Sequence, residues 1–296
     1  MEPSRAIFLN PQSGKSPDGD HLERAMRRAG LIADIHRIPT DRDVAPWLAD
    51  VSRDYDVLIA AGGDGTASAV AAAAVGCGKT LGVIPSGTLN HFARDLEIPL
   101  ELDKAAAVVA AGHTRVVDVA AVNDSIFINN ASLGAYPAML WERNRAREKG
   151  LPRPLAQGVA VVRAWLDLRS IRVRVGTDGA QFVRRSPLVF VGNSKYEVQG
   201  IKLGRRLTMT DGSLWVYALL DSGRLDALSL PFRALLGRLE SHDKFEICQA
   251  GSVTIDVARR RIGVAIDGEI RVLTPPLRFS IRPNALRTIV PATQGT

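Results

Sequence analysis

Short apolar runs alternate with amphipathic segments along the first 120 residues of this 296-residue chain. The pattern predicts buried strands at 6–10, 33–38, 56–61 and 80–85. It predicts helices at 18–30, 40–54 and 101–112, with Thr40 or Asp41 as the N-cap of the second. Gly30 and Gly112 are expected to end the first and third helices. Strands and helices in alternation are typical of an α/β domain.

The pattern changes near Asp118, where short β-branched runs separated by turn residues take over. Such runs are typical of a sandwich or barrel, so we expect a mostly β second domain. Two helical segments, 134–149 and 155–168, interrupt the strands.

The chain has 38 Lys and Arg residues and 31 Asp and Glu residues, which gives a net charge of +7 and a pI of about 9.8. This balance favours anionic partners such as nucleotides, lipid surfaces or nucleic acid, although solubility alone is an alternative reason for it. Cys77 and Cys248 form no metal-ligand spacing and are expected to be buried, reduced thiols. Without a signal peptide or a run long enough to span a bilayer, we expect a cytoplasmic protein that at most lies on a membrane.

Three polar, glycine-containing loops follow three of the predicted strands. The most prominent, Gly62–Gly63–Asp64–Gly65–Thr66, joins the strand at 56–61 to an alanine-rich helix. Backbone N–H groups at a helix N-terminus bind phosphate, and glycine lets the phosphate approach closely. The acidic side chain can bind the Mg²⁺ that bridges phosphates or accept a proton from an attacking hydroxyl. A tight turn without a ligand is the alternative for this loop alone.

The other two loops are NPQSGKS (10–16), after the first strand, and Ser86–Gly87–Thr88, after the fourth. Open parallel sheets bind ligands beyond the carboxyl ends of their strands. Three such loops therefore predict a site for a nucleotide polyphosphate.

The motifs NPQSG, GGDGT and PSGTLNHFARDL, in this order and spacing, resemble the diacylglycerol kinase catalytic-domain family of bacterial lipid kinases, related to sphingosine and ceramide kinases. FINNASLGAY, TDGSLWV, DGE and NALRTIVP extend the resemblance over nearly the whole chain. It implies a Rossmann-like, three-layer α/β domain that binds ATP and a mostly β, sandwich-like acceptor domain. The first would comprise 1–120 with the C-terminal segment 284–296, and the second 121–283.

The resemblance also implies individual site residues and the cofactors ATP and Mg²⁺. Glu269 matches the proton acceptor of the family. Asp211 matches a ligand of a structural Mg²⁺, with backbone carbonyls near Thr208 and Ser213 completing the site. The implied nucleotide contacts are Asn10, Pro11, Gln12, Ser13, Gly14, Thr40, Gly62, Gly63, Asp64, Gly65, Thr66, Ala67, Ser68 and Thr88.

The chemistry of phosphoryl transfer also calls for a carboxylate near the acceptor. Transfer depends mainly on positioning and charge neutralisation, and a lipid hydroxyl gives its proton to a base. Glu269 and Asp64 are both candidates for that base, and the sequence leaves the choice open. Asp267–Gly268, just before Glu269, is in addition a strong hairpin signal.

Three residues depart from the family pattern. Ser68 and Ala69 stand where the family usually has Asn and Glu, and His91 stands where it usually has Asp. Ser68 retains a hydroxyl, but Ala69 cannot bind a cation and His91 cannot replace an anionic ligand. These departures bear on activity, on the metal arrangement and on substrate identity.

The sequence thus predicts an ATP-dependent lipid kinase with diacylglycerol as the default acceptor. An apolar group that includes Tyr136 and Trp141 precedes a basic cluster from Arg143 to Arg153, which suits an anionic membrane surface; a helix packed on its own domain is the alternative. Two other functions stay open: an NAD kinase-like enzyme, because that family shares GGDGT, and a nucleotide-binding regulator without turnover. We find no nucleic-acid motif, and a homodimer is left open.

Overall fold

The computed structural model describes residues 3–11, 13, 19–166, 170–177, 179, 181–199, 202–220 and 245–292. The chain forms two compact units, one of residues 1–119 with 282–296 and the other of residues 120–281. Gln12 and Gly14, two of the expected nucleotide contacts, lie outside the described residues.

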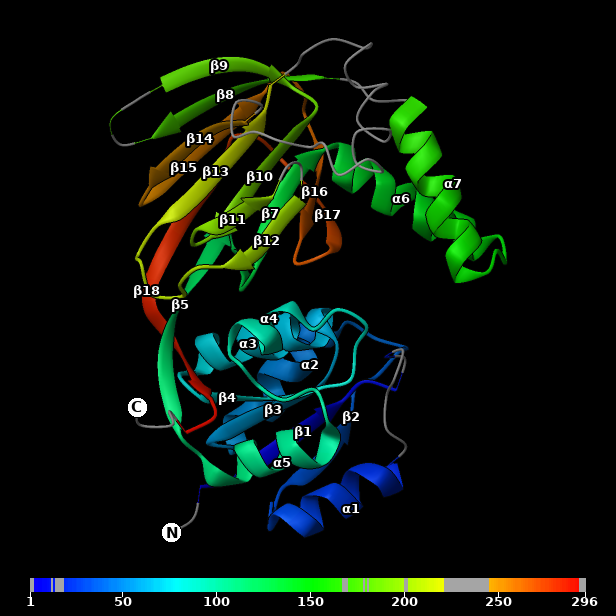
Figure 1. The fold of residues 1–296 in the computed structure, drawn as a ribbon, viewed down its shortest axis with the longest axis vertical. Coiled ribbons are helices and arrows are strands. Elements are labelled where there is room, and N and C mark those ends of the chain that lie inside the picture. Colours follow the sequence, from blue (N-terminus) through cyan, green and yellow to red (C-terminus); the bar gives the residue numbers. More distant parts are fainter. Residues whose placement is uncertain are drawn as a thin grey trace. The chain divides into compact units, whose positions relative to one another are not determined.

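The first unit is a three-layer α/β structure around a parallel sheet (Figure 1). Its strands pair in the order β2-β1-β3-β4, and the end of the long strand β18 lies beside β4. These strands are β1 (Arg5–Leu9), β2 (Asp34–Arg37), β3 (Val57–Gly62), β4 (Thr80–Pro85) and β18 (Leu277–Ile289). Residues of β1, β3 and β4 are almost all buried, as expected for strands that helices cover on both faces.

Helices α1 and α5 cover one face of this sheet, and α2 and α3 cover the other (Figure 1). The helices of this unit are α1 (Gly19–Ala29), α2 (Val44–Val51), α3 (Asp64–Cys77), α4 (His91–Asp95) and α5 (Leu102–Ala111), with a short 3₁₀ turn at Ser52–Asp54. Gly30 and Gly112 follow α1 and α5 with φ of 66° and 70°, so both predicted helix ends are confirmed.

The predicted N-cap of α2 is wrong: the cap is Asp43, whose Oδ1 accepts a hydrogen bond from the Ala45 N–H at 3.1 Å. Pro46 explains the shift. A helix capped at Thr40 or Asp41 would place this proline beyond the first turn, where its missing N–H and its ring disrupt the helix. Capping by Asp43 puts Pro46 within the first turn, where a backbone N–H has no partner in the helix.

The second unit is a β-sandwich. One sheet has the order β18-β15-β8-β9, with β5 paired to β18 and β6 paired to β5, and the other has the order β14-β13-β10-β7-β16-β17. The strands are β5 (Thr114–Val122), β6 (Ser125–Phe127), β7 (Asn130–Gly134), β8 (Ile171–Thr177), β9 (Gln181–Ser186), β10 (Leu188–Asn193), β13 (Leu214–Leu219), β14 (Phe245–Ala250), β15 (Ser252–Val257), β16 (Ile262–Ile266) and β17 (Glu269–Leu273). Both sheets contribute apolar side chains to one core, among them Val173 and Phe279 from the first and Leu133 and Val191 from the second.

Further elements surround this sandwich. A separate hairpin is formed by β11 (Tyr196–Gln199) and β12 (Lys202–Arg206). Helices α6 (Ala135–Glu148) and α7 (Arg153–Leu166) pack on each other, and α6 also packs on β7, β16 and β17. Across the described parts of the chain, no helix has both the length and the apolar character needed to span a bilayer. Cys77 and Cys248 are free and half-buried, so the expectation of full burial was wrong.

Candidate active site

The loops after β1, β3 and β4 meet at one edge of the parallel sheet. The Asn10 Nδ2 group donates a hydrogen bond to Thr66 Oγ1 at 2.9 Å, which joins the first loop to the second. Ser13 Oγ donates to the Ser86 carbonyl at 2.8 Å, and the Ser86 N–H donates to the Gly62 carbonyl at 2.8 Å. The three polar loops noted in the sequence therefore form one connected surface in the first unit.

Two of the glycines are required by the close approach of two backbones. A Cβ atom added to Gly87 would lie 2.5 Å from Gly63 Cα and 2.7 Å from Asn90 Oδ1. A Cβ atom on Gly63 would lie 3.2 Å from Gly87 Cα. The GGDGT loop and the loop after β4 can touch only because both positions lack a side chain.

Helix α3 begins directly at this contact. Gly63 is its N-cap, in an extended conformation, and no side chain caps the first turn. The first backbone N–H groups of a helix have no partner within the helix and carry a partial positive charge. Thr66 in this turn is buried and accepts the hydrogen bond from Asn10, while Ala67 is buried and Ser68 is half-buried. The edge of the sheet thus presents a helix N-terminus suited to an anion.

Asp64 connects this helix to the next one. Its Oδ1 accepts a hydrogen bond from the Phe92 N–H at 3.3 Å, near the start of α4. Asn90 precedes α4 with φ of 52°, and its side chain bonds both the N–H and the carbonyl of Gly87, at 2.9 and 3.0 Å. Sequence reasoning missed Asn90, although asparagine is one of the few residues that tolerate this conformation.

The remaining predicted contacts in the first unit lie at the same edge. Pro11 follows Asn10 after β1, and Gly65 lies in the first turn of α3. Thr40 lies in the turn after β2, and Thr88 lies in the loop between β4 and α4; both are exposed. Of the three departures from the family pattern, Ser68 and Ala69 are half-buried in α3 and His91 is exposed at the start of α4.

Glu269 lies in the second unit as the first residue of β17. Asp267 and Gly268 have φ of 46° and 85°, so they form the turn of the β16–β17 hairpin, as the Asp-Gly pair predicted. Partial burial of the carboxyl group raises the pKa of Glu269 above its ordinary value; Arg271 opposes this rise and Asp267 adds to it. A raised pKa makes the ionised carboxylate a stronger proton acceptor.

Asp267 anchors this hairpin from inside the unit. The buried carboxylate accepts hydrogen bonds from the N–H groups of Ile128, Asn129 and Asn130, at 2.9, 2.8 and 3.0 Å. The buried Arg206 binds the same segment through the Ile128 carbonyl, at 2.6 Å, and Asn129 Oδ1, at 3.3 Å. A buried charge is stable only when it is well hydrogen-bonded, so this network holds the turn before Glu269 in place. Sequence reasoning assigned Asp267 only to the turn.

We expect Asp267→Asn to lower the free energy of unfolding by roughly 2–3 kcal/mol, because the amide loses charge-assisted bonds to buried N–H groups. Urea titration followed by circular dichroism measures this change. Asp124→Asn, at an exposed turn of the same unit, is the control and should change stability by less than about 0.5 kcal/mol. Equal stability of the two variants would contradict the anchoring role of Asp267.

The predicted metal residues lie in the loop before β13. Asp211 Oδ1 accepts from the Ser213 N–H at 3.3 Å, and Asp211 Oδ2 accepts from Trp215 Nε1 at 3.2 Å. The Thr210 N–H donates to Thr208 Oγ1 at 3.2 Å. Each carboxylate oxygen keeps a lone pair, so one carboxylate and nearby carbonyls fit a Mg²⁺ that retains several waters. Within the described residues, no group of three or more His, Cys, Asp or Glu side chains forms a metal site.

Known proteins resemble this chain over most of its length. It is 29% identical over 283 residues to a diacylglycerol kinase of Bacillus subtilis (strain 168), covering 93% of this chain and 92% of that protein. It is 28% identical over 276 residues to a diacylglycerol kinase of Staphylococcus aureus (strain bovine RF122 / ET3-1), covering 91% and 87%. The crystal structure of a putative diacylglycerol kinase from Bacillus anthracis str. Sterne shares the fold, with a TM-score of 0.75 at 22% identity and 98% coverage of both chains.

Family models cover both halves of the chain. Residues 5–122 match the diacylglycerol kinase catalytic domain, and residues 138–290 match the YegS C-terminal NAD kinase beta sandwich-like domain. The two matches agree with the α/β fold of the first unit and the β-sandwich of the second. The chain therefore belongs to the diacylglycerol kinase catalytic-domain family.

Proposed function

We propose that this protein is an ATP-dependent lipid kinase, which transfers the γ-phosphoryl group of MgATP to a lipid hydroxyl, with diacylglycerol as the default acceptor. The observation that carries the proposal is the joining of three polar loops at the N-terminus of α3, in a member of this family. A helix N-terminus next to bare glycine backbone is suited to a polyphosphate.

In this proposal the first unit binds the nucleotide. Backbone N–H groups from Gly63 to Thr66, which have no partner within the helix, donate to the phosphates, and Asn10 and Ser13 hold the neighbouring loop against them. Thr40 and Thr88 offer hydroxyls at the same edge. One carboxylate oxygen of Asp64 accepts a hydrogen bond from the Phe92 N–H. Asp64 is therefore a positioning residue beside the phosphates. Mg²⁺ bound with ATP neutralises part of the phosphate charge.

Glu269 is the proposed general base. Its carboxylate takes the proton of the lipid hydroxyl, the hydroxyl oxygen bonds to the γ-phosphorus, and the bond from that phosphorus to the bridging oxygen breaks to release ADP. The raised pKa of Glu269 supports this role over that of Asp64, whose carboxylate already accepts a backbone N–H. Asp267 acts through the hairpin and is a positioning residue.

The acceptor lipid is proposed to contact α6 and α7. Leu140 and Pro137 are buried and attach α6 to its own unit, in agreement with the alternative interpretation of this segment as a helix packed on its own domain. Trp141, Leu155 and Val162 nevertheless expose 55%, 61% and 56% of their surface. Large apolar side chains with this exposure, next to the basic end of α6, suit acyl chains and an anionic interface.

A structural Mg²⁺ at Asp211 forms a separate part of the proposal. Adding millimolar Mg²⁺ should raise the Tm of the wild-type protein, because a ligand that binds only the folded state stabilises it. Asp211→Asn should abolish this rise while keeping the hydrogen bond that Trp215 donates. Differential scanning calorimetry with and without EDTA measures it. An identical rise in both proteins would place the ion elsewhere.

A nucleotide-binding regulator without turnover is the second candidate. Ala69 and His91 favour it, because the family usually has acidic residues at both positions. Nucleotide binding without transfer to any acceptor would support this candidate.

The test is transfer of labelled γ-phosphate from MgATP to lipids in neutral detergent micelles, with diacylglycerol, monoacylglycerol, a sphingoid base, phosphatidylglycerol and an isoprenoid alcohol as acceptors and NAD as a separate acceptor. Labelled lipid that requires Glu269 supports the proposal. Labelled NADP would favour the NAD kinase-like alternative, and bound ATP without any product would favour the regulator.

A further inference from the structure

Strands β8 and β9 form an amphipathic hairpin in the second unit. Ile171, Val173 and Val175 are buried in the sandwich core, whereas Arg172 and Arg174 between them are exposed. Arg185 of β9 lies directly opposite Arg172, and Val183 lies opposite Arg174. Because side chains of paired residues share one face of a sheet, the solvent face of this hairpin carries three arginines around one valine.

The basic face extends beyond the hairpin. Strand β15 pairs with β8, and β18 pairs with β15 so that Arg278 lies opposite Thr254. Arg278 is exposed on the same face. The register of β15 against β8 also places the exposed turn residues Arg259, Arg260 and Arg261 next to the start of β8, beside Arg172.

Among the described residues, acidic side chains do not balance this charge. Asp256, half-buried opposite Arg174, is the acidic residue that the strand register places on this face. Glu246 forms an ion pair with Arg184. The guanidinium group of Arg184 also lies over the Phe182 ring. Among the described residues no carboxylate lies within ion-pair distance of Arg172, Arg174 or Arg185.

The Arg172–Arg185 pair is costly for the fold alone. Like charges directly opposite each other in a sheet are destabilising. A charged edge strand protects against aggregation, but arginines on β9 alone would do this, and β8 is not the edge. The repeated arginines on two adjacent strands therefore point to an anionic partner.

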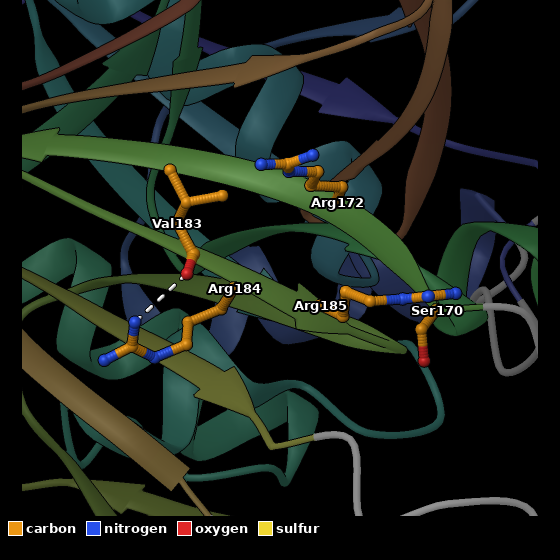
Figure 2. Close-up of a pocket in the computed structure, with 5 residues that line it drawn as sticks. All are labelled: Ser170, Arg172, Val183, Arg184 and Arg185. Atoms are coloured by element: carbon orange, nitrogen blue, oxygen red, sulfur yellow. Dashed lines mark hydrogen bonds between the residues drawn. The ribbon is translucent and has the colours of Figure 1, made fainter.

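A hollow at this face has room for phosphate groups. Ser170, Arg172, Val183, Arg184 and Arg185 line a shallow cavity of about 570 Å³. Figure 2 shows the Arg185 side chain extending toward Ser170, while Arg184 points away and donates to the Val183 carbonyl at 3.0 Å. Val183, with 38% of its surface exposed, offers an apolar contact among the guanidinium groups. Guanidinium groups bind phosphate in a bidentate manner.

We propose that this face, defined by Arg172, Arg174, Arg185 and Arg278, docks the protein on an anionic phospholipid bilayer. The inference deepens the proposed function and rests on it, because a kinase that phosphorylates a lipid meets its acceptor at a bilayer. The headgroup phosphates bind the arginines, and Ser170 and Val183 contact the interface between them. This surface is distinct from the apolar side chains of α6 and α7, to which we assign the acceptor.

Vesicle co-sedimentation tests the proposal with the full chain. Vesicles of phosphatidylcholine are compared with vesicles in which about a third of the lipid is phosphatidylglycerol, over a range of salt. Arg172→Glu/Arg185→Glu should lower the partition coefficient on anionic vesicles at least about tenfold, since each basic residue near an anionic surface contributes about a factor of five. Neutral vesicles should bind neither protein.

The matched control is Arg24→Glu/Arg27→Glu on α1, which changes the net charge by the same amount at exposed positions of the other unit. Any vesicle binding that this control loses is the part due to net charge alone. Apart from that part, it should bind vesicles like the wild type. If the control loses as much binding as Arg172→Glu/Arg185→Glu, or the latter keeps wild-type binding, the docking face is wrong. Tighter binding to single-stranded DNA than to anionic vesicles, at equal salt, would also overturn the choice of a bilayer.

A single charge-reversing substitution, tested by its effect on Tm, supplies a second and independent measurement. Arg172→Glu should raise Tm, because it replaces the like-charge pair with Arg185 by an attractive pair, and it should still weaken vesicle binding. A variant that is more stable but binds less cannot be explained by unfolding. A lower Tm together with unchanged vesicle binding would contradict the proposal.

Vesicle binding and catalysis are measured separately, so their failures can be told apart. Arg172→Glu/Arg185→Glu should phosphorylate a lipid in neutral detergent micelles at the wild-type rate, because the docking face takes no part in the transfer. If wild-type protein phosphorylates no lipid, the proposed function fails, whereas vesicle binding still tests the docking face.

Discussion

Glu269→Gln is expected to lower kcat for lipid phosphorylation by about 100- to 10,000-fold while leaving the Kd for MgATP unchanged. Glutamine keeps the size of the side chain and cannot accept the proton of the hydroxyl. Asp64→Asn, in contrast, should mainly weaken MgATP binding, because Asp64 joins the GGDGT loop to α4. Steady-state kinetics combined with nucleotide titration distinguishes the two variants, and Glu101→Gln, at an exposed position of α5's N-cap, serves as the control.

The pH dependence gives a second test of the same residue. A general base works in its ionised form, so kcat/KM should fall with decreasing pH around a pKa above the ordinary glutamate value of about 4.5. Glu269→Gln should remove this acid limb from the residual activity. A residual profile that keeps the limb would show that another group is the base.

Stability should change with pH in the opposite sense to activity. The pKa of Glu269 is higher in the folded than in the unfolded chain, so its contribution to stability is present below the unfolded value and is lost as pH rises through the folded value. Glu269→Gln should therefore have a higher Tm than the wild type at pH values above the folded pKa, and an equal Tm below the unfolded pKa. A Tm difference independent of pH would contradict the raised pKa.

Gly87→Ala should disrupt the candidate nucleotide site through a direct clash between two backbones. The new Cβ atom would meet Gly63 Cα at 2.5 Å and force the GGDGT loop away from the loop after β4. We expect a loss of roughly 1–3 kcal/mol in the free energy of unfolding from overpacking. Displacing the N-terminus of α3 by about 1 Å should lower kcat/KM by about 100-fold.

Gly76→Ala is the matched control for this change. Gly76 lies in α3 near its end, is exposed, and has no atom within 4 Å of an added Cβ. The same substitution there should stabilise the protein by roughly 0.5–1 kcal/mol, because alanine loses less backbone entropy in a helix. Chemical denaturation and nucleotide titration of both variants provide the comparison. Equal effects of the two variants would show that the Gly63–Gly87 contact is unimportant.

Local patterns determined much of the first unit. The apolar runs at 56–61 and 80–85 became β3 and β4, and Gly30 and Gly112 ended the helices where expected. The three polar loops after β1, β3 and β4 were also expected at one edge of the sheet, where hydrogen bonds join them. These predictions succeeded because they depend on periodicity, on backbone conformation and on the direction of parallel strands, all of which are local properties.

Contacts between distant residues could not be derived in this way. The role of Asp267 depends on three N–H groups 137 to 139 residues earlier in the chain, whereas its neighbours in sequence indicate only a turn. The need for glycine at Gly63 and Gly87 also arises from the tertiary structure, because a side chain on either residue would collide with the backbone of the other.

The sequence by itself therefore determined the fold class, the family resemblance and the order of the polar loops. Only the tertiary structure decided that Gly63 packs on Gly87, that Asp64 holds the start of α4, and that Arg172 and Arg185 stand side by side. The physical reason is that strand alternation predicts which face of a strand a residue occupies, but the partner on that face depends on the register between strands.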